Sequence, residues 1–309
     1  MKKFCQTKLC AIVAFLVFCC NLVVVCCVPA YADEQPKQRL QISPAIQEVG
    51  ELKPGDKYTG TFKVQNTGTE TFDFNVGVSP FFVVDENYTP DYDNSNQYTD
   101  ITEWIKLSIT SGTVTPNNEK EIAYSISVPA DVPAGGQYAV IYAEIIPSES
   151  AGDTGIAAVQ RVGMKIYSNV QGNTRKTAAI DENKIAGILF NPPITATSIV
   201  HNTGNTHARA TYVLQVYPLF SSEEVYTNEE NPVTLTILPE TRRFNSVAWE
   251  GAPRLGIFKV KQTVTIFGET STTEKVVFLI PLWFLFLILL IIFVAIFWLV
   301  SRIRNRNKY

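Results

Sequence analysis

The chain has 309 residues, of which 46% are hydrophobic, which is enough for two ordinary domains. Two apolar blocks near the ends of the chain contribute part of this hydrophobic fraction. Between them, residues 33–275 carry 19 Lys and Arg against 29 Asp and Glu, a net charge of about −10 once the seven basic residues of the two ends are set aside. A surface of that sign argues against nucleic acid as a partner and against adhesion to an anionic bilayer.

The first block has the pattern of a secretory signal peptide. Three lysines precede the apolar run AIVAFLVFCCNLVVVCCV, and Ala30 to Ala32 has the small-x-small form that signal peptidase cleaves. We expect residues 1–32 to be removed. All six cysteines lie in this segment, so the mature chain would hold no disulfide and no thiolate metal site. Lipid attachment at Cys26 or Cys27 is a weak alternative, because neither follows Gly, Ala or Ser.

Beyond a polar lead-in that ends near Arg39, the chain alternates apolar and polar residues. The clearest runs are Phe72 to Val78, Ile122 to Val128, Tyr138 to Tyr142 and Ala158 to Val170. A period of two predicts half-buried β-strands. No helical period of comparable length occurs before residue 276, so we expect residues 33–275 to be all-β.

An Asn-Thr-Gly triplet at residues 66–68 returns at residues 202–204, and similar landmarks follow both copies. The first landmark is an apolar-x-Pro step, which ends at Pro116 in the first copy and at Pro239 in the second. The second landmark is a later stretch from a Pro to a Gly, which leads into a strand. We expect each triplet to be a turn, with Asn initiating it and Gly supplying a positive φ. The ordered matches predict two immunoglobulin-like β-sandwiches, residues 40–173 and 176–273, with a boundary near Gly172 to Lys176.

The first copy has an insertion, Val84 to Trp104, that is rich in Asp, Asn and Tyr. Function is found more often in loops than in frameworks, and a tyrosine ring can stack on a sugar or anchor a protein contact. The candidate partner contacts are Tyr88, Tyr92, Tyr98, Asp91 and Asp93.

Three patterns resemble known functional motifs in part but differ from them in the residues or spacing that those motifs require. Asp91 to Ser95 begins like a calcium loop, but Asn96 stands at the Gly position and Thr102 at the Glu position, so a solvated acidic loop is favoured. The two histidines, His201 and His207, lack a recognised zinc spacing and read as exposed turn residues.

The third pattern is LPETR at residues 238–242, which resembles a sortase signal. It has Arg242 in place of Gly and lies far from the apolar segment, so wall attachment is not expected. No nucleophile elbow, phosphate loop or metalloprotease motif occurs. We therefore expect no enzyme activity, no cofactor and no metal site.

The second apolar block, residues 276–300, has 25 residues without a charge, which is enough to cross a bilayer. Trp283 and Trp298 stand near its ends, as interfacial aromatics do, and Pro281 lies near the start, where a proline is tolerated. Four basic residues follow in the tail 301–309. The positive-inside rule predicts a single-pass type I protein of the cell membrane, with residues 33–275 outside and the C-terminus in the cytoplasm.

The stretches LKPGDKYTGTFKVQNTG and WIKLSITSGTVTPNNEKEIAYSISVPADVPAGGQYAVIYAEI resemble bacterial surface proteins built of immunoglobulin-like sandwiches. The order of parts resembles the WxL-interacting proteins of Gram-positive bacteria. That resemblance implies a first sandwich that binds peptidoglycan, a second that binds a host or partner protein, one membrane helix and a basic tail.

These features favour a membrane-anchored, non-enzymatic adhesion or scaffold protein that holds cell-wall glycan or a surface protein. A carbohydrate-binding module that serves a surface enzyme complex is the alternative, and exposed aromatics spaced for sugar stacking would favour it. A hydrolase is a third hypothesis, which an acidic cleft with two close carboxylates would favour.

Overall fold

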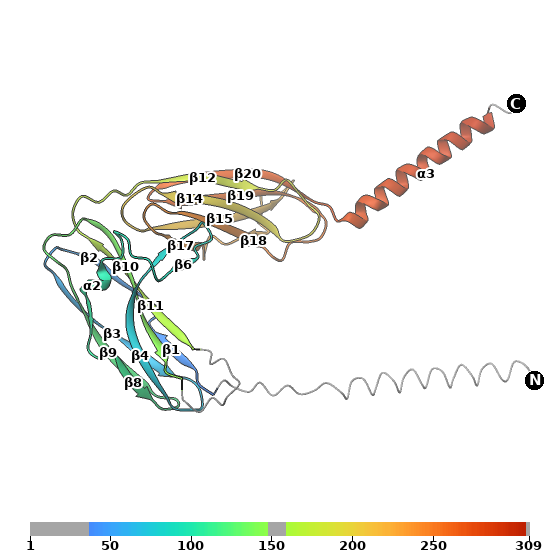
Figure 1. Cartoon of the computed structure of the whole chain (residues 1–309). Helices are drawn as coiled ribbons and strands as arrows, with labels where there is room; N and C mark the ends of the chain where they lie inside the picture. The colour runs from blue at the N-terminus through green and yellow to red at the C-terminus, as the bar shows by residue number, and fades with distance from the viewer. Residues whose placement is uncertain (1–36, 148–158, 307–309) are drawn as a thin grey trace, which may run out of the picture.

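The computed structural model describes residues 37–147 and 159–306. The predicted signal peptide lies outside these residues, as do Ala158 and the end of the basic tail. Within them the chain forms two β-sandwiches of immunoglobulin-like type and then one long apolar helix (Figure 1), which confirms the predicted fold class.

In the described residues, the first sandwich has nine strands in its two sheets, a separate two-stranded hairpin, β5-β6, and one short helix. They are β1 (Leu40–Ser43), β2 (Ile46–Leu52), β3 (Lys57–Asn66), β4 (Phe72–Pro80), β5 (Phe82–Val83), β6 (Pro90–Asp91), α2 (Ile101–Trp104), β7 (Ile105–Leu107), β8 (Ser111–Val114), β9 (Glu119–Ser127), β10 (Gly135–Ile145) and β11 (Arg161–Val170). One sheet has the order β1-β3-β9-β7 and the other β2-β11-β10-β4-β8. The chain changes sheets between β1 and β2, and β2 then pairs in parallel with the last strand, β11.

The second sandwich repeats this topology. Its strands are β12 (Ala178–Ile185), β13 (Ile188–Leu189), β14 (Ile194–Asn202), β15 (Ala208–Pro218), β16 (Tyr226–Thr227), β17 (Val233–Ile237), β18 (Arg242–Trp249), β19 (Gly256–Ile266) and β20 (Glu269–Leu279). The sheets have the orders β12-β14-β18 and β13-β20-β19-β15-β16, with β17 also on β15. Again the second strand, β13, pairs in parallel with the last, β20. This shared order of sheets is the immunoglobulin-like arrangement.

The predicted alternation produces the two cores. In β4 and β9, the apolar members of each run are buried between the sheets while their neighbours face outward. Phe62, Phe74 and Ile141 are among the fully buried residues of the first core. Tyr212, Val260 and Val264 belong to a separate second core. The four strands predicted from period two are therefore present.

The two Asn-Thr-Gly turns are held by the same network. Asn66 Nδ2 donates to the carbonyl oxygens of Glu70 at 2.8 Å and Val114 at 3.0 Å, while Gly68 N donates to Asn66 Oδ1 at 2.9 Å. In the second copy, Asn202 Nδ2 donates to Thr206 at 2.8 Å and Ile237 at 3.0 Å, and Gly204 N donates to Asn202 Oδ1. Val114 and Ile237 open the two apolar-x-Pro steps that were aligned from sequence.

The expected positive φ at the turn glycines is wrong. Neither Gly68 nor Gly204 has a positive φ, and glycine is required there by a close approach of backbone. A Cβ at Gly68 would lie 2.6 Å from the carbonyl oxygen of Lys37, and one at Gly204 would collide with the carbonyl oxygen of Arg175. Each turn thus packs on the segment that precedes the first strand of its own sandwich, because no side chain separates the two backbones.

The second sandwich extends further than predicted. Strand β20 runs to Leu279, so residues 276–279 are sheet residues and not the beginning of the apolar helix. Val277 and Leu279 are buried and Phe278 is exposed, because a strand alternates its side chains even within a wholly apolar run. The helix, α3 (Leu282–Arg306), begins after Pro281, and its candidate membrane span is Leu282–Val300.

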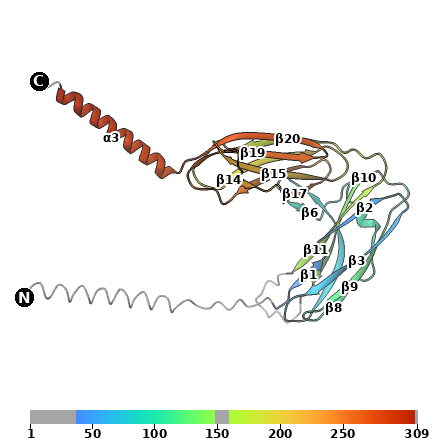
Figure 2. The ribbon, with the colours of Figure 1, turned by 180° about the vertical axis from the view of Figure 1, so that it is seen from behind.

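The two sandwiches meet at one end of the second one, and α3 leaves from its other end (Figures 1 and 2). Residues 171–177 connect β11 to β12 and include the predicted boundary. Whether each sandwich folds alone stays a prediction.

Candidate functional site

The insertion of the first sandwich packs against the second sandwich through Tyr88. The Tyr88 hydroxyl accepts a hydrogen bond from Leu238 N at 2.8 Å and shares another with Thr241 Oγ1 at 2.7 Å. The Arg243 guanidinium carbon lies 4.0 Å from the centre of the Tyr88 ring. Burial raises the pKa of Tyr88 above its usual value. Tyr88 is thus occupied by contacts within its own chain.

Tyr98 is similarly engaged. The residue is only 7% exposed, and its ring stacks on Phe82, with ring centres 5.7 Å apart and planes 6° apart. Its carbonyl oxygen accepts a hydrogen bond from Tyr138 N at 2.7 Å. Of the three candidate tyrosines, Tyr92 is the one that offers a surface to a partner, being 38% exposed and stacked on Phe81.

The two candidate acids differ in role. Asp91 closes its own turn, since one carboxylate oxygen accepts from the backbone of Asp93 and Asn94 and the other from Asn94 Nδ2. These hydrogen bonds, first that from the Asn94 side chain, hold the pKa of Asp91 below its usual range. Asp93 is exposed. The described residues contain no group of three or more His, Cys, Asp or Glu side chains placed to hold a metal.

His207 is not the exposed turn residue that the sequence suggested. It lies between the sandwiches with a 12% exposed side chain, edge-on to the rings of Tyr138 and Tyr167. Its Nδ1 lies 3.3 Å from the Tyr138 hydroxyl and its Nε2 3.5 Å from a Glu48 carboxylate oxygen. No local pattern predicts this burial, because the residues that cover His207 come from the other sandwich. His201 is half-buried within β14.

Burial lowers the pKa of His207. The Glu48 carboxylate acts in the opposite direction, but Arg209, at 3.1 Å from Glu48, shares that negative charge. Burial is the larger effect, so the imidazole is neutral near pH 7.

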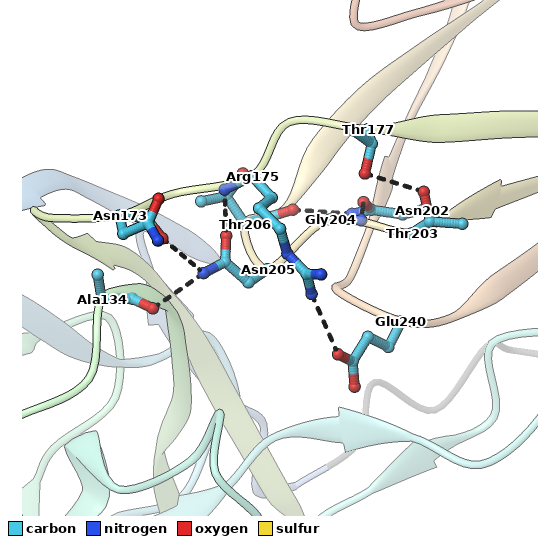
Figure 3. Close-up of polar contacts among 10 residues, drawn as sticks. All are labelled: Ala134, Asn173, Arg175, Thr177, Asn202, Thr203, Gly204, Asn205, Thr206 and Glu240. Carbon is cyan, nitrogen blue, oxygen red and sulfur yellow. Dashed lines mark hydrogen bonds and ion pairs between the residues drawn. The ribbon is translucent and has the colours of Figure 1, made fainter.

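The second Asn-Thr-Gly turn also joins the sandwiches (Figure 3). Asn205, the residue after its glycine, donates from Nδ2 to the carbonyl oxygen of Ala134 at 3.1 Å and accepts at its own carbonyl from Gly136 N at 2.7 Å. Its Oδ1 accepts from Arg175 N at 2.6 Å. The corresponding residue of the first turn is Thr69, which among described residues bonds only to Lys37, in the segment that precedes β1. The repeated turn has therefore acquired a joining role in the second copy alone.

A groove lies on the outer face of the first sandwich and includes the one exposed candidate tyrosine. Its volume is about 130 Å³, and its lining is Ser79, Tyr92, Val140, Tyr142, Arg161, Val162, Gly163 and Lys165. Strand register explains the grouping, because Tyr142 on β10 lies between Gly77 of β4 and Gly163 of β11. Gly77 leaves room for the tyrosine, because a Cβ there would collide with the Tyr142 hydroxyl, and Gly163 leaves room for the Val140 side chain.

Two cations flank the groove. The Arg161 guanidinium carbon lies 4.3 Å from the Tyr142 ring centre and forms an ion pair with Glu144. Lys165 Nζ lies 4.6 Å from the Phe81 ring centre and has no described carboxylate within ion-pair distance. Burial, with a smaller contribution from Arg243, lowers the pKa of Lys165. We call this set, Tyr92, Tyr142, Arg161 and Lys165, the tyrosine–lysine groove.

Sequence reasoning found only part of this groove. The alternation of β11 placed Arg161, Gly163 and Lys165 on one face, and the insertion drew attention to Tyr92. Tyr142 was recognised as a strand residue only, because its neighbours across the sheet are 65 residues before it and 21 after it in sequence.

Comparison with family models and with curated proteins gives no match. Solved structures with similar chains include the class 5 fimbrial chaperone CfaA, at 13% identity over 77% of this chain and 99% of that chain, with a TM-score of 0.38. A chain of the CsuC-CsuE chaperone–tip adhesion subunit complex of Acinetobacter baumannii is 11% identical over 77% and 98%, with a TM-score of 0.39. The E. coli chaperone DraB is 12% identical over 77% and 97%, with a TM-score of 0.36. Since these scores are below 0.5, the fold assignment rests on this chain's own strand pairing.

Proposed function

We propose that this chain is a membrane-anchored, non-enzymatic binding or scaffold protein of the cell surface, which holds cell-wall glycan or a surface protein in the tyrosine–lysine groove. The observation that carries the proposal is the composition of this groove. It combines an exposed tyrosine, a second tyrosine with a glycine on each neighbouring strand, and a half-buried lysine that has no ion-pair partner among the described carboxylates.

The chemistry of the groove suits a sugar that carries an acidic group. The ring of Tyr92 offers a surface on which the C–H face of a sugar can stack, while Tyr142, which carries the Arg161 guanidinium over its ring, and Val140 add apolar lining. Lys165 supplies positive charge in a region whose net charge is about −10, whereas the charge of Arg161 is largely balanced by Glu144. An acidic segment of a surface protein would meet the same groups, with tyrosine as the anchor.

The remainder of the molecule suits presentation of such a groove away from a membrane. Helix α3 contains one candidate span, Leu282–Val300, and the basic residues that follow the span favour a cytoplasmic C-terminus. The sandwiches are joined by hydrogen bonds at Tyr88 and Asn205 and by the aromatic contacts of His207. A joined pair of sandwiches would hold the groove at a defined distance from the bilayer.

A second candidate function is a carbohydrate-binding module that serves a surface enzyme complex. It is favoured by the same two tyrosines, Tyr92 of the insertion and Tyr142 of β10, because aromatic rings that line one groove can contact successive sugars. The two functions differ in their target: the first predicts retention on whole walls or on surface proteins, and the second predicts binding to an enzyme's polysaccharide substrate.

The test is binding of the full chain, reconstituted in lipid nanodiscs, to isolated cell walls and separately to extracted surface proteins. We expect Tyr92→Ala to weaken binding roughly tenfold, the value of a lost tyrosine anchor. Tyr217→Ala, at a half-buried tyrosine of the second sandwich, is the matched control and should bind normally. If the unaltered chain binds neither isolated cell walls nor surface proteins, the proposed function is contradicted. Normal binding by Tyr92→Ala would contradict the groove.

A further inference from the structure

Exposed apolar side chains gather at the end of the second sandwich from which α3 leaves. They form the membrane-proximal patch: Ile188, Phe190, Phe220, Leu255, Ile257 and Phe278. Phe220 is 97% exposed and Ile188 62% exposed. Apolar residues exposed singly need no explanation, but a contiguous set indicates a surface that contacts something apolar.

Strand pairing brings the patch together. Phe278 of β20 pairs with Ile257 of β19 on one side and with Ile188 of β13 on the other, which makes a three-residue apolar row across the sheet. Leu219 N donates to the carbonyl oxygen of Ile257 at 3.2 Å, so the loop that carries Phe220 begins beside the same row.

The patch lies close to the candidate membrane span along the chain. Phe278 precedes Leu282, the first residue of α3, by four residues, which reach at most about 14 Å when extended. Leu279 still belongs to β20, and Ile280 N donates a hydrogen bond to the Leu189 carbonyl oxygen of β13 at 2.9 Å. The connection between the sheet and α3 is therefore shorter than four residues. If α3 crosses a bilayer, the apolar row is therefore held within the interfacial layer or directly above it.

We propose that the membrane-proximal patch is a membrane-docking surface, which rests in the interfacial region of the bilayer that α3 spans. The occupant is the lipid surface itself. Burial of aromatic and aliphatic side chains at the boundary between headgroups and acyl chains provides the attraction, as for interfacial proteins in general. The net negative charge of the region outside the membrane does not oppose this contact when the lipid is uncharged, and Lys259 beside the row is paired with Glu274 at 2.9 Å.

Docking would fix the orientation of the second sandwich. A single helix after a short connection leaves a domain free to tilt, whereas a helix and an apolar patch together give two attachments to one bilayer. Because the first sandwich joins the opposite end of the second, its distance from the membrane would then be set by the length of the second sandwich (Figure 1).

The experiment places an environment-sensitive fluorescent amino acid at position 220 of the full chain, reconstituted in phosphatidylcholine nanodiscs with or without shallow nitroxide lipid. The matched control carries the same probe at position 244, where Phe244 is 42% exposed and its N–H bonds to Glu86 near the joint. We expect nitroxide lipid to remove about half of the emission at 220 and little of that at 244, because shallow quenchers act within the interfacial layer.

Equal quenching at the two positions, or free access of a water-soluble quencher to position 220, would overturn the proposal. The patch could instead be covered by a second copy of this chain. Position 220 would then be shielded from water, nitroxide lipid would not quench its emission, and the shielding would increase with the number of protein copies per nanodisc. That result would also overturn the proposal.

Discussion

His207 shows how much a single residue depends on the sandwich opposite. Burial between the rings of Tyr138 and Tyr167 lowers its pKa, so the folded chain holds it neutral. The unfolded chain takes up a proton near pH 6.5. The folded state binds that proton only at lower pH, so stability is fully present above pH 6.5 and falls as pH drops toward the lowered pKa.

We predict that the unfolding midpoint of the full chain falls by a few degrees between pH 7 and 5.5, measured by thermal scans in detergent. His207→Gln, which cannot be protonated, should remove most of the slope in this window. His201→Gln, the matched control on β14, should keep the slope. An unchanged slope in His207→Gln would show that other groups cause the pH dependence.

At the residue scale, the sequence predicted the turns but not all of their physical basis. Asn66 and Asn202 were expected to initiate turns, and both do so through their side-chain oxygen. The predicted reason for Gly68 was wrong. Glycine is required there because the Lys37 backbone leaves no space for a Cβ, and a prediction based on the φ angle of the turn alone does not include that contact. Local patterns report local geometry, and contacts between distant strands lie outside them.

At the element scale, the insertion of residues 84–104 is the main difference from expectation. It was expected to present tyrosines to a partner, whereas Tyr88 and Tyr98 hold it against the chain's own sandwiches. Composition identifies a tyrosine-rich loop as a contact surface but does not tell whether the contact is internal or external. The end of β20 was misplaced for a related reason, since an apolar strand and the start of an apolar helix have the same composition.

The insertion should loosen when Tyr88 is removed. Tyr88→Ala loses two hydrogen bonds and the Arg243 contact, so local opening of the segment becomes easier. We predict that limited proteolysis of the full chain then cleaves within residues 84–104 roughly tenfold faster. Tyr92→Ala changes an exposed neighbour on the same insertion and should leave the rate nearly unchanged. Similar rates for the two variants would mean that Tyr88 does not hold the insertion.

At the scale of the whole molecule, the order of parts was predictable and their arrangement was not. Alternation, turn residues and a repeated landmark order were sufficient for two β-sandwiches and a terminal apolar helix, because each is a local or periodic property. The joint between the sandwiches and the tyrosine–lysine groove depend on which side chains meet across strands and across domains. The groove joins Ser79, Tyr142 and Lys165 from three strands whose register no single segment encodes.

The most direct test of the groove measures affinity for isolated cell walls as a function of salt, comparing Lys165→Met with Lys106→Met in the full chain in nanodiscs. Lys165 lies in the groove, whereas Lys106 is an exposed lysine of β7 on the other sheet. We predict that Lys165→Met binds about tenfold more weakly and loses most of its salt dependence, because a charged contact of roughly 1.4 kcal/mol has been removed. Lys106→Met should match the unaltered chain. Equal affinity and equal salt dependence for the two variants would contradict the assignment of the groove as the binding site.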